Sequence, residues 1–258
     1  MIKHFEKTLK GDYRIKNDDR VGFFENEGAY LAVLCDGMGG HSYGDVAASM
    51  LVSSLGLQFQ NIAGGYKFQD AIQTKKWIGI AIETAKKELK KQVDQDPSKM
   101  QMGTTLVAAI IIPKLRRFFV FNSGDSRAYA FTHKNELIQI TKDQNVGNSM
   151  IDRGLDFVQA FSNEKARYLT SSIGPMMSTT VEIYDFDEKS YSNVKRLLLT
   201  SDGVHEFLYH SELEYLTSLS GTPEFIGTKI LEKATINQSN DNMSVIVVDF
   251  EFGGSNND

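Results

Sequence analysis

The chain has 258 residues, 41% of them hydrophobic, and a formal net charge of −5. Because it has no basic block or Arg/Lys stripe interleaved with aromatic residues, we do not expect nucleic acid as a principal ligand. No apolar stretch reaches the roughly 20 residues of a membrane span, and no apolar run follows the charged N-terminus as in a signal peptide. The single cysteine, Cys35, excludes an internal disulfide and fits a reducing compartment. We therefore expect a soluble cytoplasmic protein without a membrane partner.

The N-terminal third is predicted to pass from strands to helices. Residues 3–10 and 20–35 are predicted to form strands on either side of a polar stretch. Residues 44–59 and 66–92 carry apolar side chains at steps of three and four, the spacing of amphipathic helices.

The centre of the chain consists of short apolar runs, which predict antiparallel hairpins. Further along the chain, helices are predicted again. The predicted strands are residues 104–112, 117–122, 126–132, 136–140, 180–187, 195–201 and 243–252, and the predicted later helices are 211–218 and 223–236. A mixed, partly helical stretch covers 141–175. Strands and helices in separate blocks favour the α+β class, in one domain over 1–252 followed by a polar tail, 253–258.

Four aspartates stand at the ends of the predicted strands. Asp36 and Asp202 follow apolar runs, Asp125 follows Gly124, and Asp241 precedes the last run. The end of one strand and the start of an antiparallel neighbour share a sheet edge, so we expect Asp36, Asp202 and Asp241 to converge. Carboxylates beside glycines at the ends of strands are typical of binding sites for hard cations that prefer oxygen ligands.

Other catalytic arrangements are missing from the sequence. The five histidines and one cysteine lack zinc-ligand spacing, and there is no G-x-S-x-G or phosphate-binding glycine loop. Position 41, where a cysteine phosphatase would need arginine, is His41, so Cys35 is predicted to be a packed thiol.

Oxygen ligands alone favour Mg²⁺ or Mn²⁺, and two such ions can hold a bridging water for attack on phosphorus. Arg14, near Asp18 and Asp19, is the candidate for binding phosphate oxygens.

Eight segments carry a resemblance to a known family. They are Arg14-x-x-Asn17-Asp18-Asp19, Leu31-Ala32-Val33-x-x-Asp36-Gly37-Met38-Gly39-Gly40-His41, Met102-Gly103-Thr104-Thr105-Leu106, Gly124-Asp125-Ser126-Arg127-Ala128-Tyr129, Leu137-Ile138-Gln139-Ile140-Thr141-Lys142-Asp143, Leu169-Thr170-Ser171-Ser172-Ile173-Gly174, Leu198-Leu199-Thr200-Ser201-Asp202-Gly203 and Asp241-Asn242-Met243-Ser244. In this order they cover essentially the whole chain, which resembles the compact bacterial form of the metal-dependent Ser/Thr phosphatases of the protein phosphatase 2C (PPM) family.

The resemblance implies a fold and a ligand set. The fold would be a four-layer α-β-β-α sandwich, with two stacked antiparallel sheets flanked by helices. Two core ions of Mn²⁺ or Mg²⁺, and a weaker third, would be held by the set Asp19 (through water), Asp36 (bridging), Gly37 (carbonyl), Asp125 (third ion), Asp202 and Asp241. Arg14 would bind the substrate phosphate, and the segment from about 145 to 168 would form a flap beside the site.

Four positions depart from the family pattern. Met38 replaces the histidine proposed as general acid in eukaryotic members, and His41 is an alternative proton donor, directly or through water, or else simply begins the following helix. Asp18 stands where Glu or Gln is common, and we expect it to be peripheral. Gln144 and Asn145 replace the usual His-Ser pair, in a part that we expect to be distant in role from the metal ligands.

The resemblance implies a phosphatase that hydrolyses phosphoserine and phosphothreonine in protein substrates, and we expect it to be a monomer. It would oppose a bacterial-type Ser/Thr kinase, and the kinase itself would be among its substrates. Two alternatives remain open. One is a pseudophosphatase that acts as a binding module, which the intact carboxylates disfavour. The other is a dedicated phosphatase of a sigma-factor pathway, which the lack of an attached sensor domain disfavours.

Overall fold

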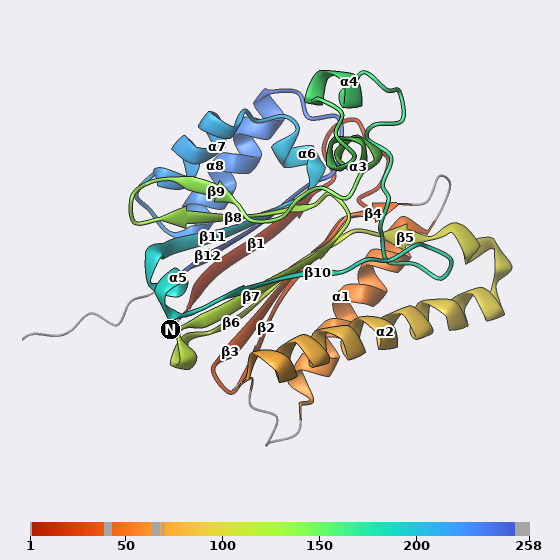
Figure 1. Ribbon diagram of the computed structural model, residues 1–258, viewed down its shortest axis with the longest axis horizontal. Coiled ribbons are helices and arrows are strands. Elements are labelled where there is room, and N and C mark those ends of the chain that lie inside the picture. Colours follow the sequence, from red (N-terminus) through yellow and green to blue (C-terminus); the bar gives the residue numbers. More distant parts are fainter. Residues whose placement is uncertain (1, 39–42, 63–67, 69, 251–258) are drawn as a thin grey trace, which may run out of the picture.

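Two five-stranded antiparallel sheets stack face to face in the structure, a computed structural model that describes residues 2–38, 43–62, 68 and 70–250. The strand order is β1-β12-β11-β8-β9 in the first sheet and β10-β7-β6-β3-β2 in the second. Helices cover both outer faces (Figure 1). The α+β class and the four-layer sandwich expected from the sequence are therefore confirmed.

The strands are short and mostly seven residues long. The first sheet contains β1 (Lys3–Leu9), β8 (Arg127–Thr132), β9 (Leu137–Gln139), β11 (Val194–Thr200) and β12 (Met243–Asp249). The second contains β2 (Arg20–Asn26), β3 (Ala29–Cys35), β6 (Leu106–Ile112), β7 (Arg117–Ser123) and β10 (Glu182–Phe186). A further two-stranded ladder joins β4 (Gly37–Met38) to β5 (Gly103–Thr104).

Three apolar clusters separate the four layers. Alternate residues of both sheets, such as Leu34 and Leu199, fill the space between the sheets. Helices α1 (Gly44–Gln60) and α2 (Ala71–Gln95) pack on the outer face of the second sheet, and α7 (His210–Ser218) and α8 (Pro223–Ile236) pack on that of the first. Strands buried on both faces explain why β3, β6 and β12 are continuous apolar runs in the sequence.

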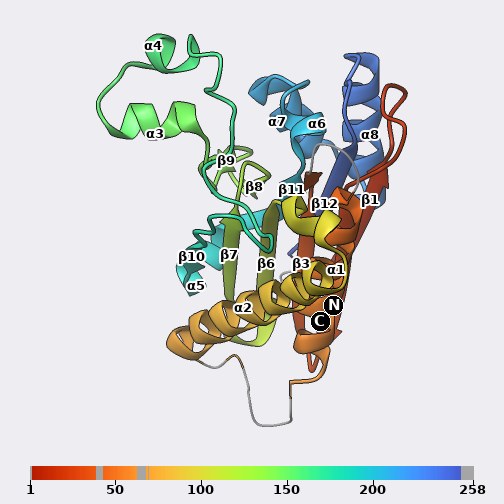
Figure 2. The same cartoon turned by 90° about the vertical axis from the view of Figure 1, so that its right-hand side faces the viewer.

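The remaining helices are short and lie in the connections. They are α3 (Val146–Asp152), α4 (Phe157–Phe161), α5 (Glu188–Asn193), α6 (Asp202–His205) and the 3₁₀ turns η1 (Pro97–Gln101) and η2 (Pro113–Leu115). Figure 2 shows α3 and α4 standing away from the sandwich, beyond the ends of the strands. No helix over the described residues has the length and apolar character needed to cross a bilayer.

Several predicted boundaries move in the structure. The region 20–35 is a hairpin whose turn places Glu27 and Gly28 at positive φ, so β2 and β3 are separate strands. The helix predicted over 66–92 begins at Ala71, where the Asp70 side chain accepts the Ile72 N–H, and it continues to Gln95. Helix α5 was not predicted, because six residues are too few to establish a helical period. The predicted tail, 253–258, lies outside the described residues.

The convergence of the aspartates has a different geometry from the one predicted. Asp202 and Asp241 do lie at one edge of the first sheet, because β11 and β12 are antiparallel neighbours. Asp36, however, follows β3 in the second sheet. The expectation that all three share one sheet edge is therefore wrong for Asp36, which reaches the other two across the sandwich.

Candidate active site

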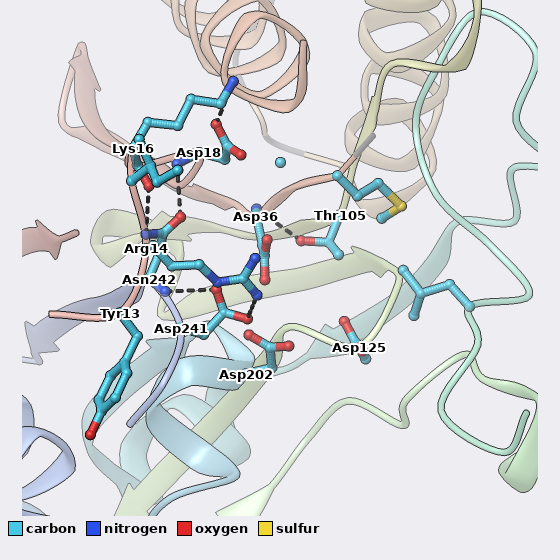
Figure 3. Close-up of a pocket in the computed structure, with 14 residues that line it drawn as sticks. Tyr13, Arg14, Lys16, Asp18, Asp36, Thr105, Asp125, Asp202, Asp241 and Asn242 are labelled. Carbon is cyan, nitrogen blue, oxygen red and sulfur yellow. Dashed lines mark hydrogen bonds and ion pairs between the residues drawn. The ribbon is translucent and has the colours of Figure 1, made fainter. Parts of the chain in front are cut away.

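A cavity of about 740 Å³ opens at the end of the sandwich where these strands stop. The carboxylates of Asp36, Asp125, Asp202 and Asp241 line it together with Arg14, as Figure 3 shows. The other lining residues are Tyr13, Ile15, Lys16, Asp18, Gly37, Met38, Thr105, Leu169 and Asn242. All the predicted site residues that the structure describes, except the buried Asp19, thus lie on one cavity.

The backbone at Asp36 is fixed by the strand opposite it. Its N–H donates to Thr105 Oγ1 at 3.0 Å, and its carbonyl accepts from Thr105 N at 2.8 Å and Thr104 Oγ1 at 2.9 Å. The next residue, Gly37, packs so closely against the start of α1 that a Cβ would lie 2.3 Å from the carbonyl oxygen of Gly44. Only glycine fits there, which explains the Asp-Gly pair at this strand end.

Asp19 lies behind the cavity and is only 1% exposed. Its Oδ2 accepts hydrogen bonds from Ser201 Oγ at 2.9 Å and Ser244 Oγ at 2.6 Å. Its Oδ1 is buried without a hydrogen-bond partner. Sequence reasoning assigned no role to the two serines, although each belongs to a quoted motif, beside Asp202 or just after Asn242.

Arg14 and Asp241 form an ion pair at the rim of the cavity. The Arg14 side chain is about half exposed, on the loop between β1 and β2. Partial burial works against its charge, but the carboxylates of Asp241, Asp202 and Asp36 together outweigh that effect and raise the pKa of the guanidinium. The predicted phosphate-binding arginine is therefore already at the site, paired with a predicted metal ligand.

The acidic cluster is electrostatically unfavourable when all its members are ionised. Burial, followed by the charge of Asp19, raises the pKa of Asp36 well above its ordinary range. Burial and the charge of Asp241 raise the pKa of Asp202 to about 6, although a hydrogen bond with Asp36 acts in the opposite direction. Burial and the charge of Asp202 raise the pKa of Asp125 to about 7. Cations bound among these carboxylates would remove the repulsion and hold them ionised.

Burial raises the pKa of Asp19 to about 7 as well, despite the two serine hydrogen bonds. Oδ1 of Asp202, like that of Asp19, is buried and accepts no hydrogen bond. Buried carboxylate oxygens without partners are unfavourable unless something else binds them, and a divalent cation or its water is a fitting partner. The donor set therefore fits Mg²⁺ or Mn²⁺.

The carboxylates surround a space, but they do not yet form a complete coordination shell. Within the described ranges, no three acidic, histidine or cysteine side chains are placed to surround a single ion. Asp241 is instead ion-paired with Arg14.

Asp125 is positioned by a segment that we expected to be distant in role. Gln144 Oε1 accepts the N–H of Gly124 at 3.0 Å, and the Gln144 N–H donates to the Gly124 carbonyl at 3.0 Å. The expectation of a distant role for Gln144 is therefore wrong, since it holds the residue next to Asp125. Arg127 forms a bidentate ion pair with Asp143, at 2.8 and 2.7 Å.

Met38, which stands in place of the histidine, and His41, the alternative proton donor, differ in whether the structure describes them. Met38 lies in β4 and lines the cavity. His41 lies outside the described residues. Asp18 does line the cavity, but Lys16 Nζ is 3.0 Å from its Oδ1 and its N–H donates to Asn242 Oδ1 at 2.8 Å. The peripheral role of Asp18 stays a prediction.

The fold and the sequence both have known relatives. The serine/threonine phosphatase stp of Listeria monocytogenes is 28% identical over 245 residues, 94% of each chain. The crystal structure of the serine/threonine phosphatase Stp1 from Staphylococcus aureus has a TM-score of 0.85 at 28% identity, covering 98% of this chain and 96% of that one. The catalytic domain of the phosphatase PstP, in complex with two manganese ions, shares the fold with a TM-score of 0.76 at 24% identity, covering 96% and 97%.

A family model agrees with the site described above. The model for protein phosphatase 2C matches residues 13–237, a range that begins beside Arg14 and includes Asp19, Asp36, Asp125 and Asp202. This chain belongs to the protein phosphatase 2C family.

Proposed function

We propose that this protein is a metal-dependent protein serine/threonine phosphatase that hydrolyses phosphoserine and phosphothreonine by attack of water. The observation that carries the proposal is the meeting of four partly buried carboxylates and one arginine on a single open cavity. Such a set binds divalent cations on one side and a phosphate dianion on the other. The relatives named serine/threonine phosphatases support the substrate class.

The carboxylates divide into distinct roles. Asp36, between the two sheets, would bridge two Mn²⁺ or Mg²⁺ ions, with the Gly37 carbonyl on one and Asp202 and Asp241 on the other. When bound, such ions lower the pKa of a coordinated water and polarise the phosphoryl group. Asp19 would accept a hydrogen bond from metal-bound water through the Oδ1 that lacks a partner, while Ser201 and Ser244 hold its Oδ2 in place. Asp125, with Asp202, would bind a weaker third ion.

Arg14 would orient the substrate. Its guanidinium carries several N–H donors in a planar fork, and it points into the cavity toward the carboxylates (Figure 3). A bound phosphate would take the place of Asp241 as its partner, so that Asp241 becomes available to a cation. The leaving serine or threonine oxygen needs a proton, which we assign to a water held by Asp125 or to His41.

The physiological setting is proposed from the family. Substrates would be phosphoproteins, including a bacterial-type Ser/Thr kinase, and the protein would act as a cytoplasmic monomer. A binding module without activity and a dedicated sigma-factor-pathway phosphatase are the alternatives. The ionisable cluster at the cavity favours the enzyme over the binding module, because a module would have no use for carboxylates held under mutual repulsion.

The test is metal-dependent turnover of p-nitrophenyl phosphate and of a panel of phosphopeptides. EDTA should abolish activity, and Mn²⁺ or Mg²⁺ should restore it. Turnover that survives thorough chelation would contradict the mechanism, and no turnover with either ion would favour the binding module. Activity confined to one phosphopeptide of the panel would favour the dedicated regulatory phosphatase.

A further inference from the structure

The loop between β1 and β2 exposes two apolar side chains at the edge of the reaction centre. Tyr13 is 64% exposed and Ile15 is 99% exposed, yet both line the same cavity as the carboxylates. They are the immediate neighbours of Arg14. Figure 3 shows Tyr13 and Asp125 on opposite sides of the acidic centre in that view. An isoleucine this exposed contributes almost no apolar burial to the fold.

The loop that carries these side chains is held firmly by the first sheet. Asn242 Nδ2 donates to the carbonyls of Lys10 at 2.8 Å and Lys16 at 3.0 Å, which closes the loop at both ends. Lys10 Nζ donates to the carbonyl of Arg14 at 2.6 Å. Gly11 has a φ of +74°, and a Cβ there would lie 2.6 Å from the carbonyl oxygen of Asp241. These contacts hold the loop backbone in place, which reduces the conformational entropy lost when a ligand covers the exposed side chains.

We infer that Tyr13 and Ile15 form an apolar subsite for the residue next to the phosphorylated one in a polypeptide substrate. The inference rests on the proposed function, in which Arg14 holds the phosphate. A peptide whose phosphate reaches Arg14 brings its adjacent residues to the rim of the cavity, which Tyr13 and Ile15 line. An aliphatic or aromatic side chain at that position would cover Tyr13 and Ile15, and a small polar one would leave them in water.

The expected size of the preference follows from hydrophobic pockets in other enzymes. One methylene group in such a pocket changes kcat/KM by roughly 10- to 200-fold. Because this subsite is open to solvent on one side, we expect a preference of about tenfold for leucine over serine, at the low end of that range.

The experiment compares two phosphothreonine peptides that differ only in whether leucine or serine flanks the phosphothreonine. The measured quantity is the ratio of their kcat/KM values with Mn²⁺. We expect about 10 for the unaltered protein and below about 3 for Ile15→Ser. The matched control is Ile72→Ser, since Ile72 is 76% exposed on α2 and away from the cavity, and it should keep the ratio.

A ratio near 1 in the unaltered protein, or one that Ile15→Ser leaves intact, would overturn the inference. So would a dimer that Ile15→Ser dissociates in sedimentation experiments while the ratio stays the same, because the loop would then bind a second copy. Turnover of p-nitrophenyl phosphate separates this failure from failure of the proposed function. If that ester is hydrolysed while the peptide ratio is 1, the phosphatase proposal stands and the subsite is wrong; if no ester is hydrolysed, both are wrong.

Discussion

Arg14 is ion-paired with Asp241, so a predicted substrate ligand and a predicted metal ligand neutralise each other. The pair lies at the rim, with side-chain exposures of 52% and 26%. Pairs this exposed contribute at most about 1 kcal/mol. The contact therefore keeps the two residues in place without opposing metal or phosphate strongly.

The first prediction concerns Arg14→Ala. The variant should raise KM for phosphopeptides by about tenfold or more, because it removes a charged donor to the phosphate, and some loss of kcat is also expected. Core-metal affinity should change by less than about fivefold, since the lost pair is a weak one. Steady-state kinetics and calorimetry with Mn²⁺ provide the two measurements. Lost metal binding with an intact KM would show that Arg14 serves the metal site instead.

The second prediction concerns the bridging and terminal carboxylates. Asp36→Asn and Asp202→Asn should each lower kcat by roughly 10² or more, because each removes charge that positions the attacking water. Asp94→Asn, at an exposed position near the end of α2, is the matched control and should leave kcat within about twofold. An effect below threefold at Asp36 or Asp202 would mean that the residue is not a ligand.

The sequence could identify the acidic residues but not how they meet. Asp36, Asp202 and Asp241 are recognisable because each adjoins an apolar run, and their residue types alone indicate a hard cation. Their meeting across two sheets depends on the stacking of layers, which no local pattern encodes. The ion pair of Arg14 with Asp241 joins residues 227 positions apart and could not be read from motif spacing.

The same limit applies to the residues that support the site. Gln144 was expected to lie at a site distant in role from the metal ligands, yet it binds both backbone polar groups of Gly124. Ser201 and Ser244 were visible in the motifs, but their shared hydrogen bonds to Asp19 require β11 and β12 to be adjacent. Contacts between distant segments are set by tertiary packing, and single-sequence reasoning finds them only through resemblance.

The third prediction concerns the pH dependence of the metal-free protein. The pKa of Asp125 rises from its ordinary 3.8 to about 7 in the folded chain, through burial and the charge of Asp202. The folded state therefore binds this proton more tightly than the unfolded state. The group's contribution is most favourable to folding below pH 3.8 and is lost as the pH rises to about 7.

Asp125→Asn isolates that contribution, because asparagine cannot ionise. In EDTA at pH 4, the variant and the unaltered protein should have similar free energies of unfolding. At pH 8.5 the variant should be more stable by about 2 to 4 kcal/mol, since it avoids the buried charge. Urea unfolding at the two pH values measures the difference. A variant that is less stable at pH 8.5 would indicate that the carboxylate makes favourable contacts that outweigh its burial.

The fourth prediction separates a catalytic from a structural role for Asp125. Its position after Gly124, between β7 and β8, allows a purely structural reading, in which the aspartate stabilises the connection between the strands. In the reading that we favour, it holds a weak third ion whose water protonates the leaving group. The protein would then have a route to general acid catalysis although Met38 has no proton to give.

Asp125→Ala should fold, retain two tightly bound ions in calorimetry, and lose roughly 10² or more of its turnover on phosphopeptides. The loss on p-nitrophenyl phosphate should be below about tenfold, because p-nitrophenolate leaves readily without a proton. Equal losses on both substrates would remove the proton-donor role. A large fall in melting temperature would instead support the structural reading, although the raised pKa of Asp125 argues that replacing its carboxylate relieves repulsion in the metal-free protein. The ratio of the two losses is therefore the decisive quantity, because a folding defect reduces both activities in the same proportion.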